Sequence, residues 1–485
     1  MKEIKIIDTT LRDGPQSLWA TRMSTPMMLP VLEKINEVGY DSVELMAMAH
    51  FDACVRYLDE DPWERIRIVN EHIKDVPTIA WIRSKNLIGF DMYSDDLVEL
   101  MVNKMVDNGI GKIAVFDGLL DIDNMVVSLN AAKERGALTV GALVFSESPI
   151  HTDELYREKT KELITKANVD TVMLKDAGGV LTPERVKTLV PVMKEVLGDI
   201  PLELHGHSLT GLAPMVYIEA VKAGVDIVHM AVSPLSNGAS QPTTQTVVKN
   251  LRDLGYKIKV NDRLIDEISE HFFKVAETEG FPIGQVAEYD AFHYKHQIPG
   301  GMLSNMVSQL EAAGIADKYD EVLEEIGRIR EDLAWPIMVT PFSQLVGTQA
   351  VLNVMNGERY KVIPDEVKKY VLGHYGKLIA PIKQNIVKKI VENGSKSITV
   401  KKNEGKFVPE LRNRYPNMTD EERILRYLIK GNHVDRMKQA GPINTSNELL
   451  DNPVVTLMKN ITNNKNYSYV SVSNKGTKIR LGALK

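Results

Sequence analysis

The sequence predicts an α/β protein, a (β/α)8 TIM barrel followed by a mainly α-helical C-terminal region. Up to about residue 235, short runs rich in Val and Ile alternate with longer segments of helical periodicity, which is the pattern of βα units around a parallel sheet. Beyond about residue 260, strand-like runs nearly vanish. No G-x-G-x-x-G motif follows the first run, which disfavours an open, doubly wound sheet.

Eight strands are expected in the first part of the chain, and eight strands with eight helices make a closed barrel. Their expected bounds are Ile4–Asp8, Ser42–Met46, Thr78–Arg83, Lys112–Asp117, Leu138–Phe145, Thr171–Asp176, Leu202–His207 and Val225–Val232. Helices are expected between them, for example over Met28–Val38, Glu64–Ile73, Leu97–Asn108, Met125–Glu134, Glu154–Ala167, Pro183–Leu197 and Ala213–Ala223. Glycines follow most of these helices, where helix C-termini are expected: Gly39, Gly109, Gly136, Gly198 and Gly224.

The second part of the chain carries helical patterns at Asp262–Glu279, Ser304–Ala313, Lys318–Asp332, Thr348–Met355, Asp365–Leu372 and Pro381–Glu392. We therefore expect a barrel domain over 1–295, a helical region over 296–440 and a tail over 441–485. The tail begins polar and Asn-rich, and it then carries two short alternating runs, 467–472 and 478–481. These runs predict a small β-hairpin.

Composition places the chain among ordinary globular proteins, with 44% hydrophobic and 26% charged residues. The net charge of −6 argues against a nucleic-acid binder, which would need a basic surface. The single cysteine, Cys54, excludes a disulfide framework and a multi-cysteine metal site, and it fits a reducing compartment. Because the chain has neither a long apolar span nor a signal-peptide core, we expect a cytoplasmic protein that could dock at the periphery of a membrane complex.

Four side chains with metal-binding chemistry end or follow predicted strands: Asp13, Lys175, His205 and His207. Residues at these ends of barrel strands face the active site. Because side chains alternate along a strand, the His-x-His pair should present both imidazoles on one face. With a carboxylate, the two imidazoles suit a first-row transition metal such as Zn²⁺, Mn²⁺ or Co²⁺. The alternative is that both histidines are partly buried polar residues near a loop.

Lys175 carries the wrong charge for a metal site, since its ammonium group would repel a cation. Carbamylated by CO₂, it would present anionic oxygens and could be a ligand. The residue types alone favour the other interpretation, an ion pair with Asp176 or another carboxylate. Arg12, Gln16 and Arg83 could each meet an acid or carbonyl group of a ligand, but any of them could equally be a salt-bridge or loop residue.

A series of motifs resembles the biotin-dependent carboxyltransferase family, found in pyruvate carboxylase, the oxaloacetate decarboxylase α subunit and the central subunit of transcarboxylase. The motifs, in order over roughly residues 1–435, are Asp8-Thr9-Thr10-Leu11-Arg12-Asp13, Gln16-Ser17-Leu18, Ala20-Thr21-Arg22, Glu60-Asp61-Pro62-Trp63-Glu64-Arg65, Arg83-Ser84-Lys85-Asn86-Leu87, Met173-Leu174-Lys175-Asp176, His205-Gly206-His207, Ser240-Gln241-Pro242, Ile298-Pro299-Gly300-Gly301 and Val346-Gly347-Thr348-Gln349-Ala350-Val351.

The resemblance implies a barrel followed by a helical funnel, with a metal held by Asp13, carbamylated Lys175, His205 and His207. It implies that CO₂ moves between carboxybiotin and a 2-oxo acid such as pyruvate or oxaloacetate through a metal-stabilised enolate.

Three further residues receive roles from the same resemblance. Arg83 would hold the carboxylate of the substrate and Gln16 its carbonyl group. Ser304 lies where the family has a proton-relaying Thr, and serine keeps the hydroxyl.

The sequence departs from the family pattern at three places around the expected pocket. Gly14-Pro15 replaces Ala-His, Met46-Ala47-Met48-Ala49-His50-Phe51 replaces Trp-Gly-Gly-Ala-Thr-Phe, and Phe90 replaces a Tyr. These changes point to a different or larger acyl substrate, or to altered handling of biotin, with the metal ligands intact.

The chain has no Met-Lys-Met motif, so the resemblance implies that biotin is supplied on a separate carrier chain. It implies as partners a biotin carboxyl carrier protein and biotin carboxylase or decarboxylase pump subunits, and it implies a homodimer.

Two other functions stay open at this point. One is a biotin-independent lyase or acyl-CoA condensing enzyme, similar to hydroxymethylglutaryl-CoA lyase or isopropylmalate synthase. Asp13-Gly14 with Gln16 is closer to that opening motif, whereas Lys175 and the long helical region argue against it. The other is a non-catalytic assembly or regulatory protein, given the altered end of the second strand.

Overall fold

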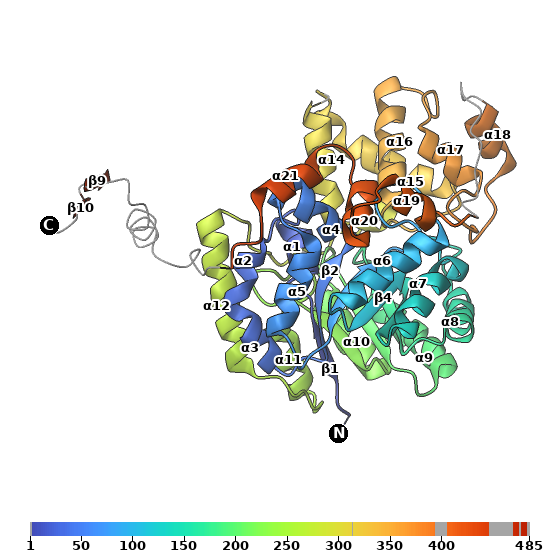
Figure 1. The fold of residues 1–485 in the computed structure, drawn as a ribbon. Coiled ribbons are helices and arrows are strands. Elements are labelled where there is room, and N and C mark those ends of the chain that lie inside the picture. Colours follow the sequence, from blue (N-terminus) through green and yellow to red (C-terminus); the bar gives the residue numbers. More distant parts are fainter. Residues whose placement is uncertain (1, 313, 393–404, 446–468, 475–476, 483–485) are drawn as a thin grey trace.

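Eight parallel strands close into a barrel in the order β1 to β8, as the sequence predicts (Figure 1). The computed structural model describes residues 2–312, 314–392, 405–445, 469–474 and 477–482. The strands are β1 (Lys5–Asp8), β2 (Ser42–Ala47), β3 (Thr78–Ile82), β4 (Lys112–Phe116), β5 (Leu138–Val144), β6 (Thr171–Asp176), β7 (Leu202–Gly206) and β8 (Ile227–Met230). The last strand is shorter than expected, and a loop leads from it to the next helix.

Helices connect the strands and surround the barrel (Figure 1). They are α1 (Asp13–Leu18), α2 (Thr25–Met28), η1 (Leu29–Val31), α3 (Leu32–Glu37), α4 (Met48–Ala53), η2 (Cys54–Leu58), α5 (Pro62–His72), α6 (Asp95–Asp107), α7 (Ile122–Glu134), α8 (Asp153–Ala167), α9 (Pro183–Leu197), α10 (Ala213–Ala223), α11 (Thr244–Asp253) and α12 (Asp262–Glu279).

The first crossover differs from the single helix expected over Met28–Val38. Pro30 lies in the 3-10 turn η1, which separates α2 from α3. Proline has no amide hydrogen and clashes with the preceding turn, so it breaks the regular helix into short pieces. The structure also places a π-helical turn, η2, between α4 and α5, where the sequence pattern indicated no element.

A mainly helical region follows the barrel, as predicted. Its elements are α13 (His293–His296), α14 (Gly300–Ala312), η3 (Ala316–Lys318), α15 (Tyr319–Asp332), α16 (Phe342–Asn356), α17 (Asp365–Val371), α18 (Gln384–Glu392), α19 (Val408–Arg414), α20 (Asp420–Leu428) and α21 (His433–Ala440). Helices α14 to α18 share a second apolar core, to which Leu119 in the loop after β4 also contributes. Helices α19 to α21 pack back on the barrel, where Asn108 donates a hydrogen bond to Glu421 and Arg436 pairs with Asp59.

Two further features complete the fold. Strands β9 (Tyr469–Asn474) and β10 (Thr477–Gly482) pair antiparallel in a sheet of their own. Among the described helices, none is both long and apolar enough to cross a membrane. The domain boundaries at 295 and 440 stay a prediction.

The interior of the barrel is divided between an apolar part and a charged part. The apolar part contains Ile7, Ala47, Ile79, Trp81, Ala114, Val140, Ala142, Met173 and Ile227. The charged part contains Glu44, Lys112, Glu203 and His229, each at most 2% exposed. Because polar groups buried in this way need partners, the charged part must be internally paired.

Candidate metal centre

The ends of β6 and β7 bring the predicted metal-binding residues side by side. Lys175 pairs in register with His205 on the neighbouring strand, and His207 follows β7 directly. Asp13 is the first residue of α1, shortly after β1. All of them therefore lie at the carboxyl edge of the barrel, where the active sites of such barrels are built.

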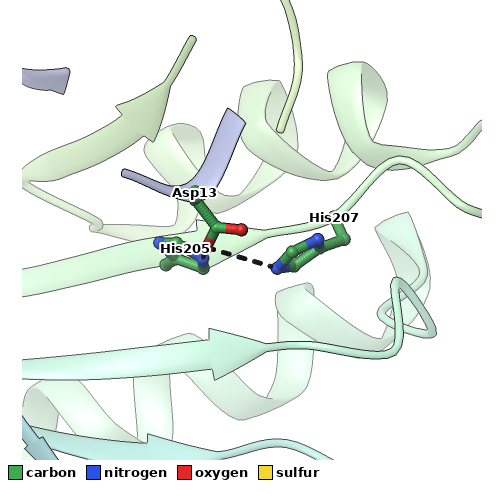
Figure 2. Close-up of side chains that lie close together, drawn as sticks. All are labelled: Asp13, His205 and His207. Carbon is green, nitrogen blue, oxygen red and sulfur yellow. Dashed lines mark ion pairs between the residues drawn. The ribbon is translucent and has the colours of Figure 1, made fainter. Parts of the chain in front are cut away.

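Asp13, His205 and His207 converge on one point (Figure 2). Asp13 Oδ2 lies 2.9 Å from His205 Nε2 and 3.6 Å from His207 Nε2. The other oxygen of Asp13 accepts a hydrogen bond of 2.8 Å from the Ser17 hydroxyl. The carboxylate and the two imidazole nitrogens thus form a three-ligand cluster suited to a metal ion.

Hydrogen positions in this cluster fit a bound cation. The Ala239 carbonyl oxygen can only accept, so His207 Nδ1, 2.5 Å away, carries the ring proton and Nε2 presents a lone pair. His205 faces carboxylates with both nitrogens, Asp13 at 2.9 Å and Glu44 at 3.5 Å, although a neutral ring has one hydrogen to donate. One of these two contacts of His205 is therefore left without a hydrogen, and a divalent cation between Asp13 and the two Nε2 atoms would remove this mismatch.

The electrostatics keep these ligands in their metal-binding forms. Burial lowers the pKa of His205 to about 4 and also lowers the pKa of His207, so both rings are neutral near pH 7. Burial opposes ionisation of Asp13, but the guanidinium of Arg12 and the two imidazoles outweigh it and hold its pKa well below the usual range. Neutral imidazoles and an ionised carboxylate are the forms that coordinate metals.

Lys175 is a buried amine without an ion-pair partner in the described part of the chain. Burial lowers its pKa to about 8, and its Nζ lies 4.3 Å from the centre of the Trp81 ring. Asp176, the partner that the residue types favoured, accepts hydrogen bonds from the amides of Val180 and Leu181 instead. An amine with a lowered pKa has a larger neutral fraction, which is the form that reacts with CO₂.

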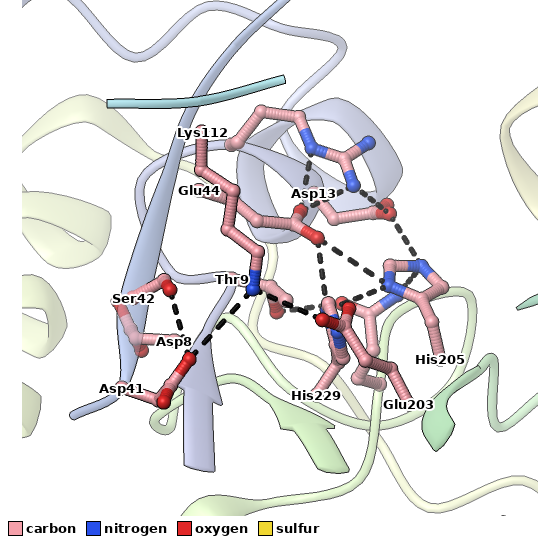
Figure 3. A network of polar contacts seen from close by, with 12 residues as sticks. Asp8, Thr9, Asp13, Asp41, Ser42, Glu44, Lys112, Glu203, His205 and His229 are labelled. Atoms are coloured by element: carbon pink, nitrogen blue, oxygen red, sulfur yellow. Dashed lines mark hydrogen bonds and ion pairs between the residues drawn. The ribbon is translucent and has the colours of Figure 1, made fainter. Parts of the chain in front are cut away.

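A chain of buried charges continues beneath the cluster along the inside of the barrel (Figure 3). Glu44 accepts from Arg12 Nε at 2.7 Å and lies 3.0 Å from His229 Nδ1. His229 Nε2 lies 3.0 Å from Glu203, which pairs with Lys112 at 2.9 Å. Arg12, which the sequence offered as a substrate ligand, is therefore engaged with Glu44 and with Asp13.

Sequence reasoning missed the Glu44, Glu203 and His229 network, although charged residues inside otherwise apolar strands were a visible signal. It also missed the contact of Gln241 with the cluster. The amide nitrogen of Gln241 lies 3.2 Å from Nε2 of both His205 and His207.

Two predicted substrate residues lie around the barrel mouth with unused polar groups. Arg83 donates only to backbone oxygens of Asn86, Leu87 and Gly89, and burial lowers its pKa to about 10. No carboxylate among the described residues forms an ion pair with it. The side chain of Gln16, in α1, forms no hydrogen bond within the described chain.

The third predicted substrate residue, Ser304, lies in α14, which contacts α1. Its side chain falls outside the residues whose side chains the structure describes. The contact between α14 and α1 nevertheless places the segment that carries Ser304 beside the helix that carries Asp13 and Gln16.

The residues that depart from the family pattern are mostly buried near the cluster. Met48 and His50 in α4 are 5% and 2% exposed. Burial lowers the pKa of His50 to about 3, and the charges of Arg12 and Asp13 act on its ring. A neutral imidazole therefore stands close to the metal-ligating end of α1.

The fold and this side-chain cluster together are those of a (β/α)8-barrel enzyme with a candidate cation site at the carboxyl edge of its strands. Residues 294–430 match a family model described as "Conserved carboxylase domain", and residues 121–271 match one described as "HMGL-like". The chain is 46% identical over 399 residues to one of the pyruvate carboxylase subunits of Methanocaldococcus jannaschii, covering 82% of this chain and 70% of that protein.

Two other proteins are similar over most of the chain. The 2-oxoglutarate carboxylase large subunit of Hydrogenobacter thermophilus is 39% identical over 394 residues, covering 81% of this chain and 60% of that protein. The carboxyl transferase domain of Rhizobium etli pyruvate carboxylase, solved with pyruvate and biocytin, superposes with a TM-score of 0.81 at 25% identity, covering 91% of this chain and 78% of that one. The chain belongs to the biotin-dependent carboxyltransferase family, whose chemistry uses biotin and a metal.

Proposed function

We propose that this chain is the carboxyltransferase component of a multi-subunit biotin-dependent carboxylase or decarboxylase acting on a 2-oxo acid. One observation carries the proposal: a buried Lys175 amine, with its pKa lowered to about 8 and no carboxylate partner among the described residues, next to the Asp13, His205 and His207 cluster. A lyase that coordinates metal without a modified lysine has no use for this amine.

The metal ligands would be Asp13, His205, His207 and Lys175 carrying a carbamate. Zn²⁺, Mn²⁺ and Co²⁺ all suit such oxygen and nitrogen ligands. When bound, the cation would polarise the substrate carbonyl and stabilise the negative charge that develops on its oxygen. The neutral imidazoles and the ionised Asp13 support this assignment, since none of these three ligands has to lose a proton first.

Arg83 would hold the carboxylate of the 2-oxo acid and Gln16 its carbonyl oxygen. The unpaired guanidinium charge and the unused Gln16 amide support these roles, because such groups are costly to bury without a ligand. Ser304 would take a proton from the carbon next to the keto group of the substrate and pass it to the biotin ring that has released CO₂. In the decarboxylating direction the same hydroxyl would return the proton.

The chain's partners would be a separate biotin carrier chain and either a biotin carboxylase or a decarboxylase pump component. The name of the M. jannaschii relative, which is one subunit of a carboxylase, supports this arrangement. We also propose a homodimer, for which sedimentation should give about twice the 54.3 kDa mass of the chain.

The acyl group would differ from that of pyruvate. Met48 and His50 fill space where the family has a glycine and a threonine, and the relatives include a 2-oxoglutarate carboxylase as well as pyruvate carboxylase subunits. A neutral His50 beside the site can donate a hydrogen bond to an additional polar group of the substrate.

The experiment supplies the chain with carrier protein bearing ¹⁴C-carboxybiotin and with a panel of 2-oxo acids and acyl-CoAs. We expect label to pass to one 2-oxo acid and to depend on added metal. Transfer only to an acyl-CoA would change the substrate class from 2-oxo acids to acyl-CoAs. Transfer to none of these compounds, by a chain that is folded and loaded with metal, would refute the proposal. The His50→Thr variant, which restores the family residue, should shift preference towards pyruvate.

A further inference from the structure

Gln241 places its amide against both imidazoles of the metal cluster. Its nitrogen lies 3.2 Å from His205 Nε2 and 3.2 Å from His207 Nε2, which are the two atoms that face the cation position. The side chain is fully buried, and it reaches the cluster from the loop that follows β8. The amide therefore shares one small volume with the metal ligands.

The distances match those between ligands of one metal ion. Two atoms that are each about 2.1 Å from a first-row cation lie about 3.0 Å apart at a right angle and about 3.4 Å apart at a tetrahedral angle. The amide of Gln241 satisfies this spacing to both imidazoles at once. Asp13 satisfies it with His205 at 2.9 Å and lies slightly beyond it from His207 at 3.6 Å.

The surroundings of the amide allow either of its ends to face the cluster. The Gln241 Oε1 accepts from the hydroxyl of Thr9 at 2.8 Å and from that of Ser240 at 3.4 Å. A hydroxyl donates as readily as it accepts, so both can pair with an NH₂ group as well. Half a turn of the amide would exchange its nitrogen and oxygen without moving the backbone and without losing these contacts.

We propose that Gln241 is a further metal ligand, which coordinates the cation through Oε1 alongside Asp13, His205, His207 and the modified Lys175. Without metal, its NH₂ group donates to the two imidazole lone pairs. With metal, the amide turns and its oxygen joins the ligand set. This inference rests on the metal centre of the proposed function and adds a residue to it.

The proposal is tested by metal affinity and by ligand-field spectra of the full-length chain. The metal is removed with a chelator, and Co²⁺ and Zn²⁺ are then titrated against a competing chelator. Gln241→Leu removes the oxygen at similar volume and should weaken binding at least tenfold, on the order seen when contacts to a metal site are lost. Gln241→Glu keeps an oxygen at this position and should bind at least as tightly as the wild type.

Two controls separate coordination from support of the fold. Gln349→Leu removes another buried glutamine, in α16, and should leave the affinity unchanged. The visible absorption of the Co²⁺-saturated chain should change in Gln241→Leu and Gln241→Glu, because the atoms bound to the metal change. Circular dichroism of each variant establishes that it is folded.

Four outcomes would overturn the proposal. Wild-type affinity in a folded Gln241→Leu, or an unchanged Co²⁺ spectrum in both variants, would show that the amide does not coordinate. A tenfold loss in Gln241→Glu as well would make the amide a hydrogen-bond donor to the imidazoles. If the wild type itself binds no metal, both the proposed metal centre and the role of Gln241 are refuted. If only the role of Gln241 is refuted, the proposed carboxyltransferase function is unaffected.

Discussion

At the scale of single residues, burial changes the pKa values of the side chains at the carboxyl edge of the barrel. Lys175 and Arg83 are cations placed where no described carboxylate pairs with them, and burial lowers the pKa of each. Arg12, a few residues from the same edge, is engaged with Glu44 and Asp13. The first two are therefore available to a ligand or to modification, while the third holds the site together.

Replacing Lys175 with Ala should abolish carboxyl transfer and lower metal occupancy. The carbamate would be lost together with the amine, while Asp13, His205 and His207 would remain. Elemental analysis of the purified protein gives the occupancy, and labelled-carboxyl transfer gives the activity. Removal of CO₂ from wild-type buffers should also reduce occupancy, whereas full activity of Lys175→Ala would rule out a carbamate role.

Replacing Arg83 with Lys should raise the KM for the 2-oxo acid by about 10- to 100-fold, because a planar, two-pronged contact with the carboxylate becomes a single charge–charge contact. Metal affinity should not change, because Arg83 forms no described contact with the ligand cluster. Steady-state kinetics separate KM from kcat. The exposed Arg263 offers a matched Arg→Lys control on α12, and an unchanged KM in Arg83→Lys would remove Arg83 from the substrate site.

At the scale of elements, the loops after β6 and β7 are packed backbone against backbone. Gly179 has a φ of +63°, and a Cβ at this position would lie 2.8 Å from the carbonyl oxygen of His207. The loop that follows Lys175 thus fixes the loop that carries His207. Glycine is required here for both its conformation and its size.

Gly179→Ala should destabilise the chain by about 1–3 kcal/mol, the usual cost of overpacking, and should weaken metal binding by displacing His207. Gly280→Ala is the matched control, since Gly280 has a φ of +71° but no atom within 4 Å of an added Cβ. Thermal unfolding and metal titration of both variants check the expectation. Equal metal affinities in the two variants would mean that the loop adjusts freely.

Across the whole barrel, charged residues from four strands alternate in sign through the interior. Glu44 on β2, His229 on β8, Glu203 on β7 and Lys112 on β4 form a continuous network below the metal cluster (Figure 3). Each charge is buried, so each depends on its neighbours. The network joins strands from opposite sides of the barrel to the residues that carry the site.

Lys112→Met should destabilise the chain by about 3–5 kcal/mol, because Glu203 would keep a buried charge with one partner fewer. The double variant Lys112→Met with Glu203→Leu should recover part of this loss in a double-mutant cycle, although His229 also contacts Glu203. Urea unfolding of the four proteins measures the coupling. Additive losses would show that the two charges do not depend on each other.

The barrel and the helical region could be predicted from the amino-acid sequence, because they depend on local periodicity, whereas the strand expected over Leu202–His207 ends at Gly206 and leaves His207 in the loop that follows. The division of the first crossover helix at Pro30 was missed because the apolar periodicity continues on both sides of this proline, although a proline inside a helical pattern is itself a signal of a break. Which side chains meet became known only from the folded chain: Thr9 and Gln241 are 232 positions apart, and Lys175 loses its expected partner because Asp176 bonds to backbone amides. Such contacts form because eight strands close into a barrel, and the spacing of residues along the chain does not reveal them.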